Sequence, residues 1–114
     1  MAQHAMKLNA IPFTKIMNGS KVIESRLLDE KRQGIAIGDT IKFSKSDDDT
    51  QEVYVKTIAL YKQPTFAELF ASFPPAEFGG ESREALLEEI HQFYTLNDEA
   101  RYGVVGIRLE LIRK

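Results

Sequence analysis

The 114 residues of this chain suffice for one domain with its own core, and 43% hydrophobic with 28% charged residues is typical of a globular fold. The lack of cysteine excludes disulfide scaffolds, thiolate zinc sites and cysteine nucleophiles. No apolar run approaches the roughly 18 residues of a membrane span, and residues 1–6 lack the features of a signal peptide. We therefore expect one cytoplasmic domain over residues 1–114, with no metal and no cofactor.

Charge is distributed unevenly along the chain. The formal net charge is −2, yet residues 1–45 carry a net charge of +4 and residues 46–114 a net charge of −6. The negative total argues against a general polyanion binder. A basic first half is compatible with one positive groove on an acidic body, although small domains also show such asymmetry by chance.

The first half of the chain predicts three strands and one helix. Alternating apolar residues favour a strand at Ala5–Leu8. A helix with an apolar stripe of Phe13, Ile16 and Met17 opens at Ile11-Pro12-Phe13, where proline costs little, and ends at Gly19. Strands are then predicted over Lys21–Leu27 and over Thr40–Phe43.

The second half predicts two more strands with helices between them. Each helix has a start signal. Thr65-x-x-Glu68 forms a capping box, and Ser82 caps a helix whose apolar stripe consists of Leu86, Leu87, Ile90, Phe93 and Tyr94. The remaining predicted elements are a hairpin connection, a long strand, a helical turn and a final strand, at Ser46–Thr50, Val53–Ala59, Asn97–Tyr102 and Val104–Ile112.

These elements predict an α+β fold with a small β-barrel of about five to six strands and inserted helices. Strands and helices do not alternate as in a parallel βαβ fold. A strand near each end of the sequence favours closure of the barrel, because pairing the terminal strands would remove a sheet edge.

Two motifs carry a family likeness. Phe13-x-x-Ile16-x-x-Gly19-x-Lys21-x-Ile23-Glu24-x-Arg26, followed by Gly38-Asp39-x-Ile41-x-Phe43, resembles the activating signal cointegrator homology (ASCH) domain. The closing Tyr102-Gly103-Val104-Val105-Gly106-Ile107 looks like the last strand of that family's small bacterial members. The family is similar in fold to the PUA domains, which are β-barrels that bind RNA. The likeness runs from about residue 6 to residue 112, and implies a cleft that binds RNA or a nucleotide.

The strand of the first motif holds the candidate ligand-binding residues. Glu24 and Arg26 share one strand face, whereas Lys21 points away unless it lies in the turn after the helix. One interpretation is a partly buried salt bridge that orients the barrel. In the other, Lys21 and Arg26 bind a phosphate or a base edge, and Glu24 accepts from an amino group or anchors Arg26. Tyr102, just before the last strand, is the candidate for stacking on a base.

The resemblance also implies an alternative function. One bacterial branch of the superfamily is an amidohydrolase that removes the acetyl group of N4-acetylcytidine with a lysine, a threonine and a glutamate. Lys21 matches the lysine, but Glu24 stands at the threonine position, so Lys21 and Glu24 would be the catalytic pair. Glu68, Glu77 or Glu81 would supply the second carboxylate. An interaction module with a vestigial cleft is the third possibility.

Three further segments invite a functional interpretation. Glu88-x-x-His91 has the spacing of half a di-iron motif, but the chain has no second copy, and we expect both side chains to face solvent. Asp47–Asp49 is interpreted as a solvated hairpin tip and not as a calcium site. The segment Phe73–Gly80, punctuated by Pro-Pro and Gly-Gly, predicts a mobile flap over the cleft.

Overall fold

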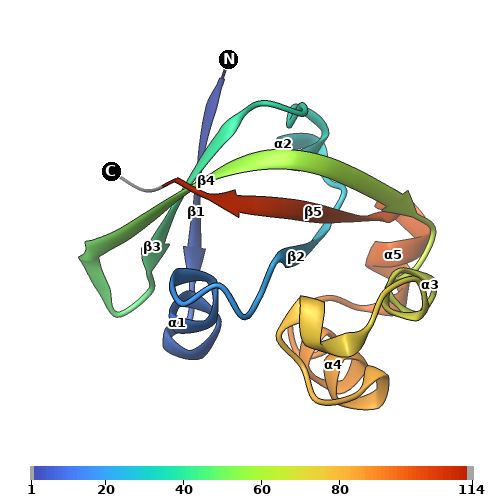
Figure 1. The fold of residues 1–114 in the computed structure, drawn as a ribbon. Helices are drawn as coiled ribbons and strands as arrows, with labels where there is room; N and C mark the ends of the chain where they lie inside the picture. The colour runs from blue at the N-terminus through green and yellow to red at the C-terminus, as the bar shows by residue number, and fades with distance from the viewer. Residues whose placement is uncertain (1, 113–114) are drawn as a thin grey trace.

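The computed structural model describes residues 2–112. Their five strands form one sheet in the order β1-β3-β4-β5-β2 (Figure 1). The strands are β1 (Gln3–Leu8), β2 (Ile23–Leu27), β3 (Thr40–Lys45), β4 (Asp48–Gln63) and β5 (Val104–Leu111). The helices are α1 (Ala10–Met17), α2 (Glu30–Gln33), α3 (Phe66–Ala71), the 3-10 helix η1 (Pro75–Phe78), α4 (Arg83–Ile90) and α5 (Leu96–Tyr102). Among these residues, no helix is long and apolar enough to cross a membrane.

The long strand β4 curls the sheet into a half-barrel. Its first part pairs antiparallel with β3 and its second part pairs antiparallel with β5. The register between β4 and β5 shifts between Thr57 and Ala59, and such an irregularity bends a strand and increases its twist. One strand therefore serves two parts of the sheet, and the predicted α+β architecture with a barrel-like sheet is confirmed.

The predicted pairing of the terminal strands is wrong. β1 pairs parallel with β3, while β5 lies between β4 and β2, so β1 and β2 form the two edges of the sheet. The position of a strand in the sequence does not specify its neighbour in the sheet. Here α1, β2 and α2 lie between β1 and its partner β3 in the sequence. A side chain spans the open seam instead, because the Nη2 of Arg26 on β2 donates to the carbonyl oxygen of Lys7 on β1 at 2.9 Å.

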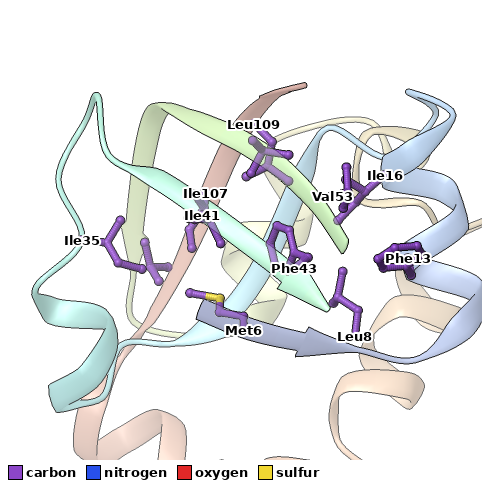
Figure 2. Packing of buried hydrophobic residues seen from close by; sticks show 12 residues of the cluster. Met6, Leu8, Phe13, Ile16, Ile35, Ile41, Phe43, Val53, Ile107 and Leu109 are labelled. Atoms are coloured by element: carbon purple, nitrogen blue, oxygen red, sulfur yellow. The ribbon is translucent and has the colours of Figure 1, made fainter. Parts of the chain in front are cut away.

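Two hydrophobic clusters pack against opposite faces of the sheet. Alternation along β5 divides its side chains, with Val105, Ile107 and Leu109 in one cluster and Val104 in the other. The first cluster fills the curl of the sheet and is closed by Phe13 of α1 (Figure 2). The second lies under the helices and contains Ile23, Phe66, Leu69, Phe70, Phe78 and Leu86 as well.

The structure differs from the sequence-based predictions at three positions. The strand expected from Lys21 begins only at Ile23, because the N–H of Lys21 donates to the carbonyl of Lys15, outside the sheet. Met17, expected in the apolar stripe of its helix, is the last residue of α1 and is 47% exposed. Phe93 was expected in the stripe of the Ser82-capped helix, but α4 ends at Ile90 and Phe93 follows it in a loop.

Packing between β5 and α3 depends on the absence of a side chain at Gly106. A Cβ at this position would lie 2.9 Å from Cδ1 of Leu69, which is fully buried and has no room to move. Gly106→Ala should therefore lower the free energy of unfolding by about 1–3 kcal/mol, measured by urea denaturation. The matched control is Gly34→Ala, where the nearest atom lies at 3.8 Å and φ is −82°; it should be neutral or stabilise by up to about 1 kcal/mol. Equal stability of the two variants would contradict this account of the packing.

Candidate ligand-binding site

A cleft with a volume of about 410 Å3 lies where the seam of the half-barrel meets the helices. Figure 1 shows α1 and α4 on either side of β2, and both helices contribute to the walls of this cleft. The lining residues are Lys7, Leu8, Asn9, Pro12, Lys21, Glu24, Ser25, Arg26, Ser46, Phe70, Phe78, Leu86, Glu89, Ile90, Phe93 and Tyr94. Small-molecule sites usually occupy about 300–1,000 Å3, so this cleft has the size of a ligand site.

The polar floor of the cleft is an ion triad. Oε1 of Glu24 lies 2.8 Å from Nζ of Lys21, and Oε2 of Glu24 accepts from Nε of Arg26 at 2.8 Å. Glu24 and Arg26 share a face of β2, as predicted. Lys21 precedes the strand, so its ammonium group bends round the strand end to reach Glu24. The structure therefore brings together three of the four predicted ligand-binding residues, and the predicted salt bridge is present.

All three side chains of the triad are nearly buried, with exposed fractions of 12% for Lys21, 5% for Glu24 and 14% for Arg26. Burial alone would raise the pKa of Glu24, but the charges and hydrogen bonds of Lys21 and Arg26 lower this pKa to about 2. Glu24 is therefore ionised at neutral pH, and the triad carries a net charge of +1. A buried charge without a partner is costly, so a ligand oxygen that approached the two cations would be favoured.

Aromatic and aliphatic side chains form the opposite wall. Tyr94 links wall and floor: its ring stacks on Phe66 at a centroid distance of 5.8 Å, and its hydroxyl interacts with Arg26. Phe70, Phe78, Leu86 and Ile90 line the inner part of this wall. Because most of these residues also belong to the second hydrophobic cluster, the wall is as rigid as the core beneath it.

The segment Phe73–Gly80 is packed against its neighbours and contributes Phe78 to the wall, and its movement as a flap stays a prediction. Phe78 is 3% exposed. Oε1 of Glu77 accepts from Nη2 of Arg108 at 2.7 Å, and the carbonyl of Gly79 accepts from Nζ of Lys15 at 2.6 Å. The prolines and glycines that indicated flexibility flank the short helix η1, which ends at Phe78 and is followed by Gly79 with a φ of 83°.

Several predicted residues lie outside the cleft. Tyr102 is not among the lining residues; it ends α5, and the guanidinium of Arg101 lies 5.1 Å from the centre of its ring. Glu68, Glu77 and Glu81 do not line the cleft either, whereas Glu89 of α4 does. The end of α4 at Ile90 places Glu89, Phe93 and Tyr94 at the cleft, and no sequence signal marked that helix end.

His91 has a specific partner that the sequence did not indicate. Its Nε2 lies 2.9 Å from Oε2 of Glu99 on α5, and Oε1 of Glu99 accepts from the backbone N–H of Phe66 at 2.7 Å. These contacts fasten the loop after α4 to the helices. Within residues 2–112, no group of three or more histidine or carboxylate side chains is arranged to hold a metal ion.

The chain matches a known domain family and resembles several solved structures. The sequence model of the ASCH domain matches residues 6–113. The crystal structure of hypothetical protein PH0355 is similar, with 32% identity, a TM-score of 0.86, and coverage of 96% of this chain and 99% of that one. Protein PF0455 from the archaeon Pyrococcus furiosus, solved by NMR, has 29% identity, a TM-score of 0.71 and coverage of 98% and 99%.

A third structure, the ASCH protein of Zymomonas mobilis, shares the fold at 16% identity and a TM-score of 0.56, with coverage of 96% of this chain and 69% of that one. No curated protein matches the chain. The likeness to small bacterial members stays a prediction.

The depressed pKa of Glu24 predicts how stability depends on pH. A carboxyl group whose pKa is lower in the folded chain stabilises it above its unfolded pKa of about 4.5, and this stabilisation is lost as pH falls toward 2. Glu24→Gln removes the contribution, so its deficit in unfolding free energy should shrink by about 2 kcal/mol from pH 7 to pH 3. Urea denaturation at both pH values measures the deficit. Glu110→Gln, at an exposed position of β5 outside the cleft, is the control, and an unchanged Glu24→Gln deficit would contradict the assignment.

Proposed function

The chain belongs to the ASCH domain family, and we propose that its cleft binds RNA or a free nucleotide. The observation that carries this proposal is a cationic floor facing an aromatic wall within one cleft of about 410 Å3. A nucleotide combines the matching features, because its phosphate and base carbonyl oxygens accept hydrogen bonds and its base has two apolar faces.

Lys21 and Arg26 supply the donors in this proposal. Neither side chain can accept a hydrogen bond, so the floor selects ligand oxygens over ligand amino groups. Glu24 is 5% exposed and both of its oxygens already accept hydrogen bonds, which makes it the residue that positions the two cations. The base then lies against the wall formed by Tyr94 and Ile90, in place of the stacking predicted for Tyr102.

The proposal includes a modest affinity. Lys7 adds one more positive charge to the lining, but Glu24 and Glu89 offset two of the three cations. Affinity for nucleic acids depends strongly on the number of phosphates that basic side chains neutralise. A cleft with so small a net charge contacts few phosphates and takes much of its binding free energy from the base.

Lys7 provides a direct test, because its side chain is exposed and has no ion-pair partner within residues 2–112. For binding to a single-stranded uridine hexanucleotide, Lys7→Gln should reduce the slope of log K against log salt by about 0.7, the value for one lost phosphate contact. The control is Lys56→Gln, an exposed lysine outside the cleft, which should keep the wild-type slope. Isothermal titration at several salt concentrations measures both, and identical slopes for the two variants would contradict the proposed cleft.

The amidohydrolase alternative receives less support from the geometry. An efficient general base has a pKa near the working pH, whereas the pKa of Glu24 is about 2 and its oxygens are held by two cations. We expect no acetate above the protein-free control when the chain is incubated for hours with N4-acetylcytidine and followed by NMR. Acetate release that disappears in Lys21→Gln or Glu24→Gln would establish the alternative.

A further inference from the structure

Phe93 stands at the mouth of the cleft with 61% of its surface exposed. All other phenylalanine and tyrosine residues within residues 2–112 are buried or partly buried. The remaining large hydrophobic residues with comparable exposure, such as Ile37 and Leu96, are aliphatic and lie outside the cleft. An exposed flat ring at the edge of a binding cleft has room for a flat partner.

The backbone on both sides of Phe93 is fixed. The N–H groups of Phe93 and Tyr94 both donate to the carbonyl of Ile90 at 3.1 Å. On one side, His91 contacts the buried carboxylate of Glu99 at 2.9 Å, and on the other, Tyr94 stacks on the core residue Phe66. The backbone that carries Phe93 is therefore fixed, and ordering it on binding costs little further conformational entropy.

The two neighbouring aromatic residues differ in depth. Tyr94 belongs to the inner wall beside Arg26, whereas Phe93 marks the outer rim. A base bound over the ion triad against Tyr94 leaves the face of Phe93 uncovered. The next base of the same strand would emerge at the rim, where it would meet that face.

We propose that Phe93 stacks on a second base, so that the ligand of the cleft is single-stranded RNA of at least two nucleotides and not a free mononucleotide. This inference rests on the proposed function and specifies its ligand. Stacking of one base on an aromatic side chain corresponds to about a 5- to 150-fold gain in affinity.

The decisive ligands are a uridine dinucleotide and the same molecule with an abasic ribose as its second residue, because they differ only in the second base. The wild-type chain should bind the dinucleotide about 5- to 150-fold more tightly, whichever end the first base occupies. Phe93→Ala should bind the two ligands equally, and Phe93→Tyr should retain the preference. Titration calorimetry and a circular dichroism check of folding complete the comparison.

Fluorescence provides a second readout, because the chain has no tryptophan. In Phe93→Trp the single indole should be quenched by the dinucleotide but much less by its abasic analogue. Ile37→Trp is the matched control, since Ile37 is 62% exposed and lies outside the cleft, and its fluorescence should not change with either ligand.

The outcomes separate this inference from the proposed function. If both ligands bind wild type equally well, the second base has no site and the inference is overturned, while the cleft remains a nucleotide site. If neither binds, the proposed function fails and the inference fails with it. If sedimentation shows a wild-type dimer that Phe93→Ala dissociates, a second copy of the chain covers the ring and the inference is also wrong.

Discussion

The ion triad of Lys21, Glu24 and Arg26 is the interaction on which both the fold and the candidate site depend. Glu24 holds Lys21 on one oxygen and Arg26 on the other, and the same Arg26 guanidinium crosses the seam to the carbonyl of Lys7. The group that links the two edge strands is thus also the floor of the cleft. Loss of the carboxylate would leave two nearly buried cations without a counter-charge, a cost of about 3–5 kcal/mol for buried pairs in general.

The helices make the cleft a pre-formed site. The wall segment η1 is attached at Glu77 to the sheet through Arg108 and at Gly79 to α1 through Lys15. α4 and α5 are joined through the contact of His91 with Glu99. The contacts of η1 connect elements far apart in the sequence, whereas His91 and Glu99 join two consecutive helices. The proposed ligand would therefore meet a surface that folding has already ordered, which lowers the entropic cost of binding.

Local sequence patterns predicted most of the helices and strands, but they did not predict which strands pair or where α4 ends. Alternation identified the strands and cap residues such as Ser82 identified the helices, because both signals act over a few residues. Strand pairing did not follow, since β1 joins β3 through contacts that no local pattern encodes. The site shows the same division: Glu24 and Arg26 were predicted from one strand, but Phe93 depends on where α4 ends.

The structural salt bridge and the proposed ligand site are compatible within one arrangement of the triad. A single cation would suffice to neutralise Glu24, yet two are present, and the second leaves a net positive charge close to a largely apolar wall. Arg26 has a structural role as well, through its bond to the carbonyl of Lys7, but desolvation makes the net positive charge of the triad unfavourable unless an acceptor compensates it. The excess faces the cleft and not the core, where a ligand oxygen can compensate it. The charge imbalance therefore points to an occupant with exposed oxygen acceptors beside a flat apolar surface, which is the description of a nucleotide.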